Sequence, residues 1–104
     1  MQIQFNTDNN ITSSEGLRAP MEQLINESLN RFDPYISRIE VHFTDENNSK
    51  KAKDEKRCLI EARLNGHQPV AVTHHGDDLQ LALRGALQKI KNLLDSIIER
   101  ARNH

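Results

Sequence analysis

The last quarter of the chain places the strongest constraint on the fold. Residues 77–102 read "DDLQLALRGALQKIKNLLDSIIERAR" and repeat apolar residues at steps of three and four. These apolar positions are Leu79, Leu83, Ala86, Leu87, Ile90, Leu94, Ile97 and Ala101. The spacing predicts a long amphipathic helix. Such a helix must bury its apolar stripe against another element, so the rest of the chain has to supply a broad apolar surface.

Four segments with a different period can form that surface. Residues 3–7, 37–45, 57–65 and 69–74 alternate apolar and polar side chains, which is the period of half-buried strands. The predicted inward positions are Ile3, Phe5, Ile39, Val41, Phe43, Cys58, Ile60, Ala62, Leu64, Val70 and Val72. Asn65-Gly66 predicts a tight hairpin turn between the last two strands, because both residues tolerate a positive φ.

A second amphipathic helix is predicted over residues 11–32, between the first two strands. Its apolar positions are Leu17, Met21, Leu24, Ile25, Leu29 and Phe32. Ser14, or a capping box of Thr12 and Glu15, can bind the first free N–H groups. Pro20 removes one backbone hydrogen bond, which predicts a bend or an irregular first turn, and Asp33-Pro34 is expected to end the helix.

The order of these elements predicts the fold class. A βαβββα chain forms one right-handed βαβ crossover followed by two antiparallel hairpins. With both helices on one face of a four-stranded sheet, the result is a two-layer α+β sandwich. The 104 residues fit a single domain, 1–104, with residues 46–56 as a solvated loop. The chain shows neither a secretory signal nor an apolar run that could cross a bilayer, so a soluble cytoplasmic protein is expected.

The stretch "VTHHGDDLQLAL", residues 72–83, suggests a metal site at first sight. Strand alternation, however, turns His74 inward and His75 outward, whereas a metal site needs three or four converging ligands. Asp77 and Asp78 lie at the first turn of the last helix, where a carboxylate accepts backbone N–H bonds. We therefore expect a strand that ends where a helix begins, without metal or cofactor, and keep a metal site as the less favoured alternative.

Signatures of catalysis are weak. The chain has no glycine-rich phosphate loop, no GxSxG and no CxxC motif, and Cys58 is interpreted as a small buried hydrophobe. A mixed polar row is predicted on the open face of the sheet, formed by Glu40, His42, Glu61, Arg63, Thr73 and His75. Cross-strand ion pairs are the favoured interpretation of that row, and an acid/base pair is the alternative. No catalytic residue is assigned.

The distribution of charge says more than the net charge of -1. Residues 1–48 carry 3 basic and 8 acidic residues, and residues 49–104 carry 11 basic and 7 acidic residues. The candidate RNA-binding residues are Lys50, Lys51, Lys53, Lys56, Arg57, Arg84, Lys89, Lys91, Arg100 and Arg102. Arg84, Lys91 and Arg102 fall within about 20° of one helical stripe, which Asp95 interrupts. An ordinary solvated helix and loop would also explain these charges.

Exposed aromatic residues do not alternate with these basic residues in the sequence, so contacts to phosphate and helix shape are expected rather than stacking on bases. Double-stranded RNA is recognised in this way.

The chain also resembles a known family, the ribosome hibernation-promoting factors, which includes ribosome-associated inhibitor A and was also named for sigma-factor modulation. The resemblance lies in the element order and in "IQFNTDNN" (3–10), "SEGLR" (14–18), "RFDPYISRIEVHF" (31–43) and "DDLQLALRGALQKIKNLL" (77–94). It implies a domain similar to the double-stranded-RNA-binding domain. It also implies a non-enzymatic factor that lodges between head and body of the small ribosomal subunit and blocks the tRNA and mRNA path.

The resemblance implies that the partners are ribosomal RNA and proteins of the small subunit, with no membrane and no small-molecule substrate. The chain is similar to the short form of the family, which lacks a second domain. It differs from lysine-rich relatives, since the first helix offers only Arg18 and Arg31 among several glutamates. A protein–protein regulatory module that has lost RNA binding is the second hypothesis, and an enzyme using the open sheet face or His74 and His75 is the third.

Overall fold

The computed structural model describes residues 1–7, 15–45 and 56–102. The elements are β1 (Gln2–Thr7), α1 (Glu15–Leu29), the 3-10 helix η1 (Asn30–Tyr35), β2 (Ile36–Asp45), β3 (Lys56–Leu64), β4 (Val70–Gly76) and α2 (Leu79–Arg102). Apart from η1, this is the predicted βαβββα order. None of the described helices is long and apolar enough to span a membrane.

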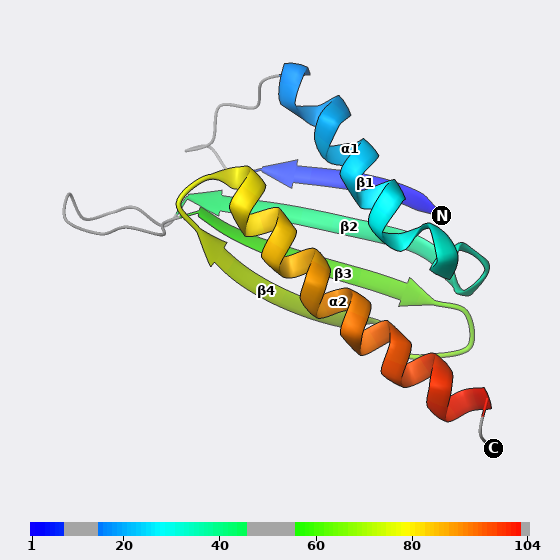
Figure 1. The fold of residues 1–104 in the computed structure, drawn as a ribbon. Helices are drawn as coiled ribbons and strands as arrows, with labels where there is room; N and C mark the ends of the chain where they lie inside the picture. Colours follow the sequence, from blue (N-terminus) through cyan, green and yellow to red (C-terminus); the bar gives the residue numbers. More distant parts are fainter. Residues whose placement is uncertain (8–14, 46–55, 103–104) are drawn as a thin grey trace.

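The four strands form one sheet in the order β1-β2-β3-β4. β1 pairs with β2 in parallel, and the other two pairings are antiparallel. Figure 1 shows α1 and α2 lying over the same face of this sheet, with their carboxyl ends toward the same side of the molecule. The predicted two-layer α+β sandwich is therefore confirmed.

The core lies between the sheet and the two helices. Its buried residues are Ile25, Leu29, Phe32, Ile36, Ile39, Val41, Phe43, Cys58, Ile60, Ala62, Ala82, Leu83, Ala86, Leu87, Ile90 and Leu94. The alternation of the strands thus predicted the inward face correctly. The prediction was wrong for Ala101, which is exposed, because the last turn of α2 reaches beyond the strands (Figure 1). Ala82, which was not predicted, is buried instead.

The end of the first helix also differs from the prediction. The α-helix stops at Leu29, and the chain continues as η1 to Tyr35. Pro34 explains the change, since in an α-helix its ring would clash with the carbonyl of Asn30 and it has no N–H to donate. Pro20 lies inside α1, as predicted, whereas the predicted caps at residues 12–14 lie outside the described residues.

The hairpin between β3 and β4 turns at Gly66, whose φ of 73° lies in the left-handed region that glycine adopts easily. The connection is longer than a two-residue turn, because β3 ends at Leu64 and β4 begins at Val70. The backbone N–H of Asn65 donates to the carbonyl of Tyr35 at 2.9 Å. This bond ties the end of η1 to the hairpin.

Candidate nucleic-acid interface

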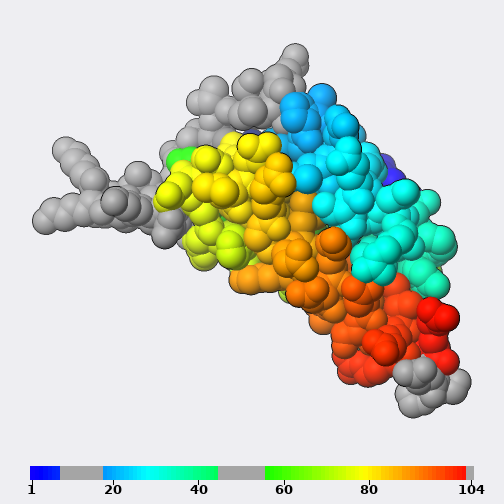
Figure 2. Space-filling view, viewed as in Figure 1, coloured from blue at the N-terminus to red at the C-terminus, as the bar shows by residue number. Residues whose placement is uncertain are grey.

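The basic residues predicted on α2 separate into two flanks of the helix. Arg84, Lys91 and Arg102 share the flank that faces α1 and η1, and we call these three residues the α2 stripe. Lys89 and Arg100 lie about 140–160° around the helix from the stripe. In Figure 2, α1 and η1 (blue to cyan) and α2 (yellow to red) lie side by side across one face of the molecule. The α2 stripe therefore lies beside the junction between α1–η1 and α2, which together form the helical layer.

Asp95, which the sequence places within the α2 stripe, is held by Arg31 of η1. Two nitrogen atoms of Arg31 contact the two carboxylate oxygens of Asp95 at 2.6 and 2.7 Å. The Arg31 guanidinium also lies 4.1 Å from the centre of the Phe32 ring. The hydrogen bond from Arg31 lowers the pKa of the Asp95 carboxyl, and the pKa of Arg31 is raised by the same contact. The negative charge of Asp95 within the stripe is therefore compensated by Arg31, and both side chains lie at the surface.

The other flank of α2 lies beside β4, which forms an edge of the sheet. Lys89 Nζ donates a hydrogen bond of 2.7 Å to the backbone carbonyl of Thr73. A lysine on an exposed edge discourages pairing with another strand. Arg100 donates to Ser96 Oγ at 3.3 Å and lines a cleft of about 420 Å³. The side chains of Lys89 and Arg100 thus each donate a hydrogen bond within the protein, which makes them less available to a ligand than the three residues of the α2 stripe.

Of the remaining five predicted residues, Lys56 and Arg57 begin β3, and the other three precede it in the chain. Arg57 pairs in register with Thr44 and His75, so it belongs to the open face of the sheet. Lys56 precedes it in the alternation and lines a cleft of about 290 Å³ on the helix side, next to Pro20 and Leu79. Lys50, Lys51 and Lys53 lie outside the described residues. The seven predicted residues that the structure describes therefore do not lie on one surface.

The open face of the sheet carries an ion-pair network. Arg38, Arg63 and His42 lie 3.3, 3.6 and 3.6 Å from the carboxylate of Glu40, whose side chain is only 12% exposed. Arg63 also lies 3.9 Å from Glu61. Cross-strand ion pairs were the favoured interpretation of this row, and the contacts confirm it. Glu40 and Glu61 offset two of the three arginines on this face, Arg38, Arg57 and Arg63, so it is a weaker candidate for phosphate binding than the α2 stripe.

The two histidines diverge as predicted. His74 packs against α2, where a Cβ on Gly85 would lie 2.0 Å from its ring, while His75 is exposed in the next position of β4. Asp78 Oδ1 accepts a 2.8 Å hydrogen bond from the Leu81 N–H, so Asp78 caps α2 as expected. The described residues hold no group of three or more metal-ligand side chains. That the protein binds no metal stays a prediction.

Cys58 is fully buried in the core. Burial raises the pKa of its thiol to about 12, which keeps it protonated near neutral pH. Its interpretation as a small hydrophobe is confirmed.

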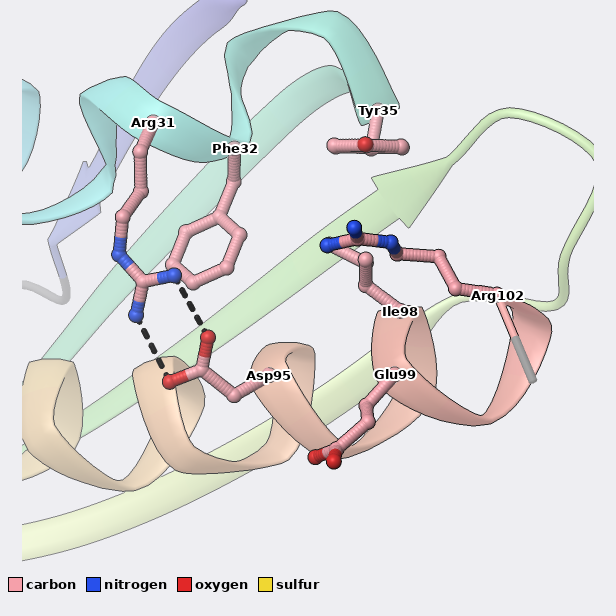
Figure 3. Close-up of a pocket in the computed structure, with 7 residues that line it drawn as sticks. All are labelled: Arg31, Phe32, Tyr35, Asp95, Ile98, Glu99 and Arg102. Carbon is pink, nitrogen blue, oxygen red and sulfur yellow. Dashed lines mark hydrogen bonds and ion pairs between the residues drawn. The ribbon is translucent and has the colours of Figure 1, made fainter.

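The residue that sequence reasoning missed is Tyr35. It lines a cleft of about 700 Å³ between η1 and the carboxyl-terminal half of α2 (Figure 3). The lining residues are Arg31, Phe32, Tyr35, Asp95, Ile98, Glu99 and Arg102. In the sequence no aromatic residue alternates with basic residues, yet the fold brings Tyr35 next to two arginines. Its position directly after Asp33-Pro34, at the end of a helix, was the available sign of an exposed ring.

Two solved structures are similar in fold. The amino-terminal domain of Protein Y from Thermus thermophilus has 20% identity and a TM-score of 0.68, with 93% of this chain and 99% of that chain covered. A ribosomal subunit interface protein from Coxiella burnetii has 22% identity and a TM-score of 0.71, covering 95% and 99%. No match was found among curated proteins.

Residues 4–102 match the family described as sigma 54 modulation protein / S30EA ribosomal protein. The match spans nearly every element of the fold, from β1 to the last turn of α2, and it agrees with the resemblance seen in the sequence. The chain therefore belongs to the sigma 54 modulation protein / S30EA ribosomal protein family.

Proposed function

We propose that this protein is a factor that binds the small ribosomal subunit and lowers translation, promoting ribosome hibernation, under stress or slow growth. Membership of its family indicates a ribosome-associated protein. The observation that carries the finer proposal is the α2 stripe, three basic side chains beside the junction of the helices, with the intervening Asp95 compensated by Arg31. In this proposal the protein works in the cytoplasm by occupying space and catalyses no reaction.

The physical basis is contact with phosphate. Lys and Arg that neutralise phosphates release condensed counterions, and this release supplies much of the affinity for nucleic acid. Arg84 and Arg102 are exposed and Lys91 is half-buried, so all three can reach a ligand. The net charge of -1 leaves little general attraction for RNA, which favours a local contact over unspecific binding.

The test is sedimentation of stationary-phase lysate through a sucrose gradient at low salt, with the protein detected in each fraction. Wild-type protein is expected with the small subunit and with whole ribosomes. Arg84→Glu and Lys91→Glu, singly and together, should shift it to the top of the gradient. Arg18→Glu is a matched control, because Arg18 is also exposed but lies on α1 and pairs with Glu22 at 3.8 Å.

Wild-type protein that stays at the top of the gradient would refute the ribosome proposal and leave only the fold. A protein–protein module predicts a different result, namely co-purification with a protein partner, little response to salt and no effect of the α2 reversals on ribosome fractions.

A further inference from the structure

The cleft beside the α2 stripe contains an aromatic ring that the core does not use. Tyr35 is 44% exposed, and among the described residues Leu81 is the other large hydrophobic side chain with this degree of exposure. The backbone of Tyr35 is held in place by Pro34 before it and by the bond from the Asn65 N–H. The ring is therefore presented from a fixed backbone, which reduces the entropy lost when a ligand binds.

Of the two arginines that line the cleft with this ring, one is not engaged in an ion pair with another described residue and is available to a ligand. Arg31 and Asp95 form one wall of the cleft and compensate each other. Arg102 makes no ion pair with another described residue. In Figure 3 the Tyr35 ring and the Arg102 guanidinium are both seen edge-on at the same side of the cleft, while the Glu99 carboxylate points away from them. The cleft thus offers a flat aromatic face and an accessible guanidinium.

The cleft is also continuous with the α2 stripe. Arg102 is the last member of the stripe and follows Lys91 by about 16 Å along the helix. A volume of about 700 Å³ lies within the usual range for sites that bind small organic groups, roughly 300–1,000 Å³. A strand whose phosphates contact Arg84 and Lys91 would therefore reach the cleft at its end.

We propose that this cleft binds one unpaired nucleotide of RNA, with its base stacked on Tyr35 and its phosphate at Arg102. The inference rests on the proposed function. It adds to the phosphate contacts of the α2 stripe a contact with a single-stranded loop, bulge or end of the RNA. Stacking on tyrosine accepts any base, and unpaired bases are the parts of RNA that proteins stack most often. Phosphate contacts alone would leave the exposed ring of Tyr35 without a role.

The chain itself supplies the reporter for a test. Tyr35 is its single tyrosine and it has no tryptophan, so tyrosine fluorescence reports on this site alone. A single-stranded RNA tetranucleotide is titrated into the full chain at low salt, beside an RNA duplex of the same bases. The single strand is expected to quench the fluorescence in a saturable way, and the duplex much less. Absence of quenching by the single strand would overturn the inference.

A second arm measures the affinity of variants for purified small subunits. Tyr35→Leu should bind roughly 5- to 100-fold more weakly, the range that follows from losing one stacked base, and Tyr35→Phe should restore most of the affinity. Arg102→Gln should weaken binding of the tetranucleotide. Leu81→Ala is the matched control, since Leu81 is 51% exposed but lies at the start of α2, away from the cleft.

The two arms separate this inference from the proposed function. If the α2 reversals abolish ribosome binding while Tyr35→Leu binds like wild type, the function stands and the nucleotide site is wrong. If wild-type protein does not sediment with ribosomes but the tetranucleotide quenches Tyr35, the nucleotide site stands alone. Quenching by ribosomal proteins but not by RNA would overturn the inference and indicate a protein contact.

Discussion

At the scale of the residue, Asp78 shows how one side chain defines the start of α2. Its carboxylate accepts the N–H of Leu81, and its carbonyl accepts the N–H of Ala82 at 3.0 Å, which is the first hydrogen bond of the helix. A carboxylate here also meets the positive end of the helix dipole. Asp78 in "HHGDDL" is therefore explained by helix capping.

Replacing Asp78 by alanine should destabilise the protein by about 1 kcal/mol, because the N–H of Leu81 loses its acceptor. Urea unfolding followed by circular dichroism measures the loss. Asp78→Ser should retain most of the stability, since a serine hydroxyl can accept the same bond. A midpoint of Asp78→Ala equal to that of wild type would show that the cap contributes nothing.

Gly85 lies against the ring of His74, and we expect this contact to reverse the usual effect of a glycine-to-alanine substitution on helix stability. Glycine inside a helix normally costs up to about 1 kcal/mol relative to alanine, so Gly85→Ala would stabilise an isolated helix. Here the added Cβ would lie 2.0 Å from the His74 ring, so either the ring or the helix must move. We expect Gly85→Ala to lower the melting temperature in the wild-type background and to raise it in a His74→Ala background. Equal effects in both backgrounds would contradict this contact.

At the scale of the element, one ion pair adds a polar contact between η1 and α2, beside the buried ring of Phe32. Arg31 and Asp95 join the carboxyl end of the first helical segment to the second half of α2. The Arg31 guanidinium, although exposed, also lies over the ring of Phe32. It therefore shapes both the α2 stripe and the wall of the Tyr35 cleft (Figure 3).

This pair predicts a pH dependence. The pKa of Asp95 is lowered in the folded protein by Arg31, so its stabilising effect is present above the unfolded pKa of about 3.9 and is lost as the pH falls through the folded value. Asp95→Asn should be less stable than wild type at pH 7, and the difference should vanish in strong acid. Urea unfolding across this pH range measures it. Glu99→Gln is the control, because Glu99 makes no ion pair with another described residue.

The elements themselves were predictable from the sequence because each has one dominant face. Alternation predicted the inward residues of β2 and β3, and steps of three and four predicted α2. The candidate site was less predictable, since the sequence gives the position of a residue along its helix but not what packs beside it. Helix geometry alone placed Asp95 in the α2 stripe, but it could not show that Arg31 compensates it. Nor could it show that Tyr35 and Arg102 line one cleft, because that arrangement depends on how η1 packs against α2.

At the scale of the whole molecule, the protein has a nearly neutral sheet face and a helical face with a short basic stripe. On the open side of the sheet, Glu40 and Glu61 offset two of the three arginines, Arg38, Arg57 and Arg63. This asymmetry means that a polyanion should contact the molecule from the helical side. The small net charge also means that binding should depend on few contacts.

The dependence of binding on salt tests this. Each phosphate contact contributes roughly 0.7 to 0.9 to the negative slope of log affinity against log salt, so the three residues of the α2 stripe should contribute about 2 to 3. Removing the charges of Arg84 and Lys91 should reduce the slope by about 1.4 to 1.8. Affinity measured for purified small subunits at several salt concentrations gives these values. A slope that the variants leave unchanged would place the phosphate contacts elsewhere on the molecule.

The position of α2 at the end of the fold also affects how the protein is made. Six of the sixteen buried apolar residues in the described part of the chain belong to α2, and the farthest along is Leu94. During synthesis α1 and the strands emerge first, and the part of the apolar sheet face that α2 covers stays uncovered until α2 has left the ribosome. A chain shortened after Gly76 should therefore show no cooperative unfolding transition. Since the α2 stripe lies on the same helix, the proposed ribosome binding would also require that α2 has left the ribosome and packed onto the sheet.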